Sequence, residues 1–250
     1  MGKKYKNPPI IEALCEFRLT SETQWDLTVP GIIYEQLKES LPGREPRIIQ
    51  ELELIQGPDA SQRQIHTRAR EGVIFFTENK EVLVQVGPHL LSIHVFKPYP
   101  HWEGFKPRIE MAWKSLQMAV KIQGLERITL RYINQIELPE QEVRIAEYFE
   151  FYPYLGPKLP QNVSLFFAGV YFLYSNDRDL CRIQLYPLAP LREKNSFRLD
   201  IEYFLAKPRA VEVADAIAWV EEAHSRVEEV FEGCITDKLR EMFGVLEYEG

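Results

Sequence analysis

Residues 10–19 read Ile-Ile-Glu-Ala-Leu-Cys-Glu-Phe-Arg-Leu. Apolar side chains occupy every second position from Ile11 to Leu19, and the positions between them carry the charged residues. This period of two is typical of a β-strand that has one face in the core and the other in solvent. Pro8 and Pro9 precede the stretch and favour an extended backbone. The sequence therefore predicts a half-buried first strand.

A similar order of elements recurs twice along the chain. After the first strand, Pro30-Gly31 opens a short helix, several strands follow, and a long helix begins near His101. A second strand-first series begins at Ile128. The pattern predicts an α+β fold of duplicated β-α-β-β-β-α units, with antiparallel sheets covered by long helices. Residues 1–126 form the first repeat and residues 127–250 the second, fused into one compact unit.

The expected elements can be given by range. In the first half we expect strands at 47–54, 63–70, 73–77, 81–86 and 90–96. In the second half we expect a strand at 128–138, a short helix at 140–149, strands at 163–174, 180–186 and 197–205, and one terminal helix at 210–243. The stretch Val163–Tyr174 is apolar on both of its faces. Such a strand is typical of the buried centre of a sheet, and we place it there.

Composition is that of a globular protein, with 45% hydrophobic residues among 250. The net charge of −7 is unevenly distributed, since residues 138–250 hold 12 basic and 20 acidic side chains. An acidic half argues against nucleic acid as a partner, because binding to phosphate backbones relies on clustered Lys and Arg. The same asymmetry can orient a charged protein partner.

The three cysteines, Cys15, Cys181 and Cys234, are odd in number and far apart. This pattern favours reduced thiols, buried as small apolar groups, in a cytoplasmic protein. No apolar stretch follows the basic N-terminal residues, so we expect no secretory signal. The longest apolar runs are far shorter than the roughly 20 residues of a membrane-spanning helix, and we expect no membrane role.

Chemical motifs are absent from the sequence. The five histidines have no zinc-ligand spacing, the glycines form no phosphate-binding loop, and no serine lies in a nucleophile-elbow motif. We therefore predict no catalytic residues, no metal and no cofactor. Dispersed carboxylates leave an unrecognised hydrolase or nuclease as the least favoured hypothesis.

A few residues interrupt these patterns and are candidates for contact with a partner or ligand. Asn134 lies on the apolar face of its strand beside Tyr132, and His224 lies in the apolar stripe of the terminal helix. Both are also explained as hydrogen-bonded core residues. Two loops rich in proline and aromatic residues suit protein recognition. The candidate contacts are Tyr99, Trp102, Tyr132, Asn134, Tyr152, Tyr154 and His224.

The opening Tyr5-Lys6-Asn7-Pro8-Pro9-Ile10-Ile11-Glu12-Ala13 resembles the N-terminal signature of a sporadically distributed prokaryotic family. Residues 130–136, together with His224, Phe231 and residues 235–244, fit the same family. The family has no established reaction, so the resemblance implies an accessory protein of mobile or defence-associated genes. One similar protein type accompanies the protease-coupled type III-E CRISPR effectors.

These features favour a non-enzymatic accessory or regulatory protein that binds another protein, through aromatic loops and open sheet edges. The alternative is a small-ligand sensor, with a pocket between the two halves lined by Tyr132 and Asn134.

Overall fold

The computed structural model describes residues 3–56, 63–140, 142–160, 165–191 and 194–246. Its strands are β1 (Ile10–Leu19), β2 (Gly43–Gln56), β3 (Arg63–Phe76), β4 (Val82–Gly87), β5 (Leu90–Phe96), β6 (Leu125–Leu138), β7 (Ala168–Tyr174), β8 (Asp179–Leu191) and β9 (Lys194–Leu205). Its α-helices are α1 (Val29–Leu37), α2 (His101–Ala119), α3 (Ala216–Cys234) and α4 (Asp237–Phe243), and two 3-10 turns lie at Ile145–Glu147 and Val213–Asp215.

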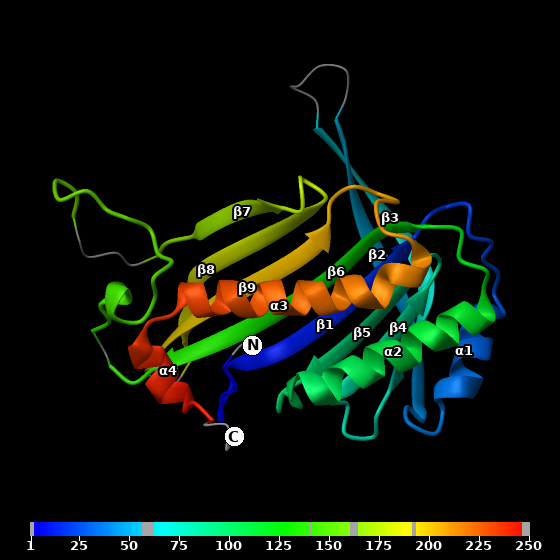
Figure 1. Ribbon diagram of the computed structural model, residues 1–250, viewed down its shortest axis with the longest axis horizontal. Coiled ribbons are helices and arrows are strands. Elements are labelled where there is room, and N and C mark those ends of the chain that lie inside the picture. The colour runs from blue at the N-terminus through cyan, green and yellow to red at the C-terminus, as the bar shows by residue number, and fades with distance from the viewer. Residues whose placement is uncertain (1–2, 57–62, 141, 161–164, 192–193, 247–250) are drawn as a thin grey trace. The chain divides into compact units, whose positions relative to one another are not determined.

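The strands hydrogen-bond in the order β2-β3-β4-β5-β1-β6-β9-β8-β7 (Figure 1). Antiparallel pairing is found for β2–β3, β3–β4, β4–β5, β6–β9, β8–β9 and β7–β8. The predicted α+β class is therefore confirmed. In the part of the chain just described, no helix is long and apolar enough to span a bilayer.

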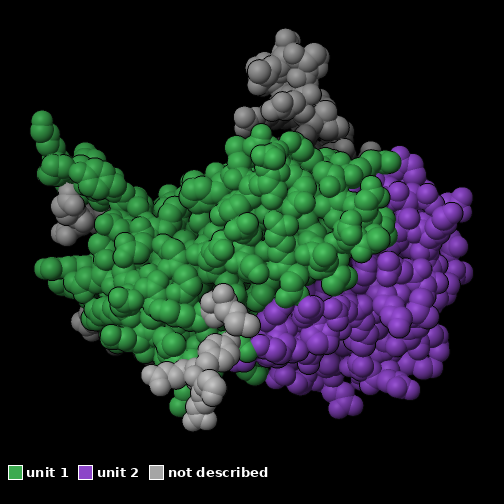
Figure 2. Space-filling view, in the orientation of Figure 1, with its two compact units in different colours: residues 1–15, 96–99, 127–250 green, residues 16–95, 100–126 purple. Residues whose placement is uncertain are grey.

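The chain folds as two compact units, which are coloured separately in Figure 2. Unit 1 contains residues 1–15, 96–99 and 127–250, and unit 2 contains residues 16–95 and 100–126. The chain passes between the units at four points, and the last of these lies at the boundary predicted between the repeats.

In unit 1, helix α3 lies along one face of the strands β6, β9 and β8 (Figure 1). Its buried side chains are Ala216, Trp219, Val220, Ala223, Val227 and Cys234. Val220, Val227 and Cys234 recur every seven residues and point inward, and Trp219 and Ala223 widen the buried stripe. Burial of such a stripe is the main source of helix stability, because removing apolar surface from water contributes about 25 cal/mol per Å².

In unit 2, the helices α1 and α2 bury the stripes that their spacing predicted. Ile33 and Leu37 of α1 are fully buried, and so are Phe105 and Leu116 of α2. The Trp113 ring stacks on Phe17 of β1, with ring centroids 4.4 Å apart. A stacked aromatic pair of this kind stabilises the packing of α2 on β1.

Three expected elements differ in the structure. The ranges 63–70 and 73–77 form one strand, β3, which leaves five strands in the first half, one more than the four of the predicted unit. In the described part of 140–149, only the 3-10 turn Ile145–Glu147 is helical. The terminal helix is not continuous, because Ile235 is extended and separates α3 from α4.

The last two differences have one physical cause. Ile235 forms a β-bridge with Phe149, and the amide of Thr236 donates to the carbonyl oxygen of Tyr148 at 3.0 Å. The Thr236 hydroxyl also donates to the carbonyl oxygen of Glu147, at 2.7 Å. Backbone groups that would continue both helices are thus used to join the two segments.

The expectation of a buried central strand at 163–174 is wrong. Its described residues form the strand β7, which begins at Ala168 and is the last strand of the sheet order. Tyr171 and Leu173 are 59% and 66% exposed. Apolar side chains on both faces indicated burial, but here they lie at an edge.

Candidate functional site

The candidate site is an exposed apolar segment in unit 1, comprising the described residues of 152–174, which we call the apolar segment. It includes the loop that precedes β7 and β7 itself. Of the 15 exposed large apolar residues in the described chain, eight lie here. They are Tyr152, Tyr154, Leu159, Leu165, Phe167, Tyr171, Phe172 and Leu173.

Strand β7, at the edge of the sheet, has apolar side chains on both of its faces. Tyr171 pairs across the sheet with Arg182, and Leu173 pairs with Leu180. Phe167, just before the strand, stacks on Tyr186 of β8, with ring centroids 5.8 Å apart. On the opposite face, Tyr174 lies against Tyr203 at 5.4 Å. The strand is therefore anchored on one side by β8 and packs aromatic rings along its length.

A network of charged groups lies beside this margin, on the sheet face that β6, β9 and β8 turn away from α3. Arg131 donates two hydrogen bonds to the Asp200 carboxylate, at 2.8 and 2.5 Å. Arg182 pairs with Glu202 at 2.6 Å, and Arg127 pairs with the same carboxylate at 2.9 Å. Bidentate pairing with Asp200, which is 2% exposed, raises the pKa of the Arg131 guanidinium. These ion pairs fix the charged side chains on this face of β6, β9 and β8, next to the apolar strand β7.

A second buried carboxylate ties the β7–β8 turn to α3. Asp179 is fully buried and accepts hydrogen bonds from Trp219 Nε1 at 2.9 Å and from the Tyr203 hydroxyl at 3.1 Å. Arg178 donates to the same carboxylate at 2.7 Å. Burial, and then the Asp179 charge, raise the pKa of Tyr203 above its ordinary value. These hydrogen bonds satisfy the buried charge and fix the start of β8, which follows the β7–β8 turn.

Three of the sequence-predicted contact residues meet in a chain of hydrogen bonds. The Tyr99 hydroxyl lies 3.1 Å from the Tyr132 hydroxyl, which in turn lies 3.1 Å from Nδ1 of His224. Nε2 of His224 lies 3.3 Å from Oε1 of Glu228, one helical turn further along α3. The sequence did not single out Glu228, although its spacing of four residues from His224 was a signal.

The Tyr132 hydroxyl, in the middle of these hydrogen bonds, has little capacity for acid–base chemistry. Tyr132 is 5% exposed, and burial raises its pKa well above the ordinary value. The hydroxyl therefore stays protonated at neutral pH and serves as a hydrogen-bond donor. Its contacts connect β6 to α3, and a part for Tyr132 and His224 in binding a partner stays a prediction.

The other predicted contact residues lie apart from that chain. Asn134 is 2% exposed and donates from Nδ2 to the Leu199 carbonyl oxygen at 3.0 Å, across the β6–β9 pair. Trp102 belongs to unit 2, where its ring meets Phe105 edge-on at 6.0 Å. Tyr152 and Tyr154 are 39% and 82% exposed and belong to the apolar segment.

The three stretches that carry the family resemblance are joined in unit 1. The amides of Lys6 and Asn7 donate to the carbonyl oxygens of Gly244 and Phe243, at 2.8 and 2.9 Å. The amide of Gln135 donates to the Pro9 carbonyl oxygen, at 2.9 Å. The signature residues thus hold the chain ends against β6, which gives them a structural role.

Comparison with known sequences adds no relative. The chain matches no protein-family model, and no significant match to a curated protein was found.

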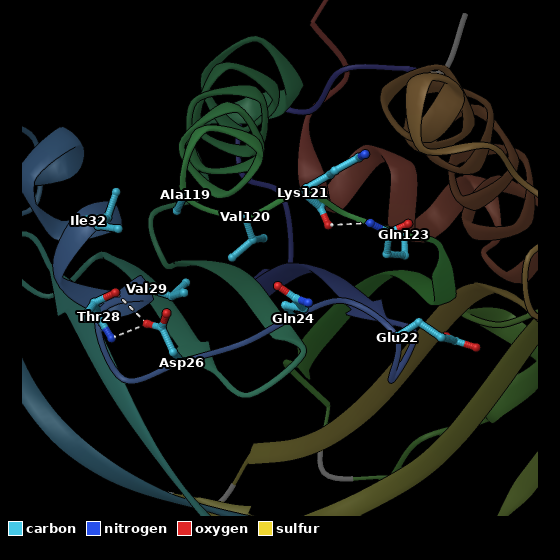
Figure 3. A pocket seen from close by; sticks show the side chains of 10 residues that line it. All are labelled: Glu22, Gln24, Asp26, Thr28, Val29, Ile32, Ala119, Val120, Lys121 and Gln123. Atoms are coloured by element: carbon cyan, nitrogen blue, oxygen red, sulfur yellow. Dashed lines mark hydrogen bonds between the residues drawn. The ribbon is translucent and has the colours of Figure 1, made fainter.

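A pocket of about 600 Å³ lies in unit 2, between the start of α1 and the segment that follows α2 (Figure 3). Its lining includes Asp26, Lys121 and Gln123. Thr28 donates two hydrogen bonds to Asp26, from its amide at 2.7 Å and its hydroxyl at 2.5 Å, and they lower the pKa of that carboxyl. None of the predicted contact residues lines this pocket. The small-ligand-sensor hypothesis expects a pocket lined by Tyr132 and Asn134, and neither residue lines this one.

The three cysteines lie in the interior of the protein. Cys15, Cys181 and Cys234 are free thiols and buried, as predicted. Burial raises the pKa of both Cys181 and Cys234 to about 12. In the described ranges, no three His, Cys, Asp or Glu side chains are grouped so that they could hold a metal ion.

Proposed function

We propose that this protein is a non-enzymatic accessory protein that binds another protein chain through the apolar segment. The observation that carries the proposal is the concentration of exposed large apolar residues, eight of the 15 described, between residues 152 and 173. Exposed apolar side chains concentrated in one segment support an interaction site there, because leaving apolar surface in water is costly.

The composition of the segment supports the same proposal. The ten residues from Leu165 to Tyr174 include no charged side chain and no proline. Sheet edges are commonly protected from pairing by lysine, proline or a bulge, and β7 has neither of the two residue types. An unprotected edge strand suits strand addition, in which main-chain hydrogen bonds give affinity and alternate side chains give specificity.

Charge indicates which partner would associate fastest. Residues 138–250, which include the apolar segment, have 12 basic and 20 acidic side chains. A partner with basic residues beside an apolar stretch would be attracted over a distance of about one Debye length, roughly 8 Å at physiological salt. We propose a basic partner on this ground, and the cytoplasm as the place of binding on the ground of the buried, reduced thiols. A role in prokaryotic, CRISPR-associated defence rests on the resemblance of the N-terminal signature.

We also propose that the two halves arose by internal duplication. The first half orders its strands β1-β5-β4-β3-β2, and the second half orders them β6-β9-β8-β7. In both, the opening strand pairs with the last strand of a meander, and a long helix follows that last strand in sequence. Matching connectivity supports the proposal, although the first half has one additional strand.

The proposed function is tested by capturing partners on purified, tagged protein from a native lysate, with quantification by mass spectrometry. Tyr154→Ser and Leu159→Ser remove exposed apolar side chains from the loop before β7. We expect each to retain about tenfold less of a specific partner, because truncating an interface anchor costs more than about 1 kcal/mol. Leu27→Ser is the matched control, since Leu27 is 93% exposed and lies in unit 2. Equal capture by all four proteins would contradict the proposal.

A further inference from the structure

We infer that the free edge of β7 pairs with β7 of a second copy of this chain, antiparallel and about a two-fold axis at Tyr171. The inference rests on the proposed function and names a partner for one part of the apolar segment. It leaves the loop with Tyr154 and Leu159 available for a different protein.

The outer edge of β7 is available for pairing with another strand. In the described structure β7 pairs only with β8, so the amide and carbonyl groups on its other side are not used in a strand ladder. Its seven residues correspond to about 23 Å of ladder at the usual rise per residue. Pairing with another strand would satisfy these groups along the full length of β7.

The side chains of β7 are self-complementary in size. The strand reads Ala-Gly-Val from residue 168, then Tyr171, then Phe-Leu-Tyr to residue 174. Antiparallel pairing centred on Tyr171 places residue 168 opposite 174, 169 opposite 173, and 170 opposite 172. Every small side chain then faces a large one in the other copy. Facing side chains are the unit of sheet stabilisation, and this register pairs a small with a large one at every position except Tyr171, which faces Tyr171 of the other copy on the axis.

The existing β7–β8 pair follows the same rule of size. Phe172 faces Cys181, and Ala168 faces Leu185. A parallel pairing of two β7 strands in register would instead place Phe172 beside Phe172 and Gly169 beside Gly169. The antiparallel arrangement is also the one that a closed two-fold dimer requires, since both copies use the same surface.

Two copies carry the same net charge of −7, which opposes their association wherever charged surfaces meet. Residues 165–174 have no charged side chain, so self-pairing here brings no like charges directly together. It also places Tyr171 and Leu173, which are 59% and 66% exposed, beside apolar side chains of the second copy.

The test is the mass of the purified protein in solution, by light scattering and sedimentation over a range of concentrations. We expect the wild type to reach twice the 29.3 kDa of one chain. Tyr171→Lys places two lysines against each other on the two-fold axis, and we expect it to weaken the dimer at least tenfold. Leu27→Lys, at a position that is 93% exposed in unit 2, is the matched control and should dimerise as the wild type does.

A size exchange makes the test specific for the register. Val170→Phe opposes Phe172 of the other copy with a second large ring, and should weaken the dimer. The double variant Val170→Phe with Phe172→Val exchanges the two side chains, restores the pairing of small with large, and should recover most of the affinity. Circular dichroism and the unfolding midpoint verify that each variant is folded.

The outcomes separate the two proposals. A wild type that stays at 29.3 kDa at all concentrations overturns the inference, and so does a dimer that Tyr171→Lys leaves unchanged. If the wild type is a monomer and Tyr154→Ser still reduces partner capture, the proposed function holds and only self-pairing fails. If dimerisation follows the expected pattern and capture is insensitive to Tyr154 and Leu159, self-pairing holds and recognition of another protein by the loop fails.

Discussion

The Tyr132 hydroxyl lies 3.1 Å from Nδ1 of His224, and this contact joins the central strand β6 to the long helix α3. Nε2 of the same ring lies 3.3 Å from Oε1 of Glu228, and the Tyr132 hydroxyl also lies 3.1 Å from the Tyr99 hydroxyl. The donor and the acceptor in the contact with Nδ1 depend on which ring nitrogen carries a proton. The contacts thus run from Tyr99 through Tyr132 to His224 and Glu228.

The first prediction concerns the stability that His224 contributes. His224→Phe removes a hydrogen-bond partner of the buried Tyr132 hydroxyl, and we expect it to lower the free energy of unfolding by about 1–3 kcal/mol. Tyr132→Phe, combined with it, should cost less than the sum of the two single changes, with a coupling of at least about 0.5 kcal/mol. Urea denaturation of the four proteins measures the cycle.

Ser225 offers a control on the same helix. Its side chain is exposed, and Ser225→Ala should change stability by less than about 0.5 kcal/mol. Strict additivity of His224→Phe and Tyr132→Phe would show that the observed contact contributes nothing.

Much of this architecture could be predicted because the helices carry their apolar residues at regular spacing. The buried stripe of α2, with Phe105 and Leu116, needed only the period of the helix. The break at Ile235 could not be predicted, because it depends on pairing with Phe149, which is far away in sequence. Long-range pairings leave no local period to recognise.

Strand β7 shows a limit of a different kind. Its sequence has apolar residues on both faces, and in most sheets that pattern means burial. The pattern shows only that both faces are apolar and does not say what covers them. The sequence therefore predicts Tyr171 and Leu173 in the core, whereas they are 59% and 66% exposed on the last strand of the sheet order. The contact between Tyr132 and His224 was likewise unpredictable, although both residues had been singled out.

The second prediction concerns the thiols. Cys15, Cys181 and Cys234 are at most 3% exposed, and the pKa of two of them is raised by burial. Reaction with a disulfide reagent should therefore require unfolding, at a rate about a thousandfold or more below that of an exposed thiol. Counting modified cysteines by mass spectrometry, with and without denaturant, checks this. Ser225→Cys supplies the exposed reference, and rapid native labelling of Cys181 would contradict the burial.

The third prediction concerns Asp179. Asp179→Ala leaves Arg178, Tyr203 and Trp219 without their common acceptor, and we expect a loss of about 3–5 kcal/mol of stability. Asp179→Asn retains an acceptor oxygen and should cost less. Asp177→Asn is the matched control, because Asp177 is exposed in the adjacent turn. Denaturation followed by tryptophan fluorescence measures the effect, and equal midpoints for Asp179→Ala and the wild type would refute it.

The last prediction is a pH dependence at Tyr5, whose hydroxyl donates to Oε1 of Glu232 at 2.5 Å. Burial, and then the hydrogen bond to Glu232, raise the pKa of Tyr5 above its ordinary value of 10.0. Below that value the folded and unfolded states are both protonated, and the stabilising contact is fully present. Above pH 10.0 the unfolded state loses this proton while the folded state keeps it, so stability falls as pH rises, by up to about 1.4 kcal/mol per pH unit.

Tyr5→Phe should therefore reduce the alkaline slope of the unfolding free energy. Tyr154→Phe is the matched control and should leave the slope as in the wild type, because Tyr154 is 82% exposed. Denaturant unfolding at neutral pH and at several values above 10.0 gives both slopes, and the same slope for Tyr5→Phe and the wild type would mean that Tyr5 is not buried against Glu232.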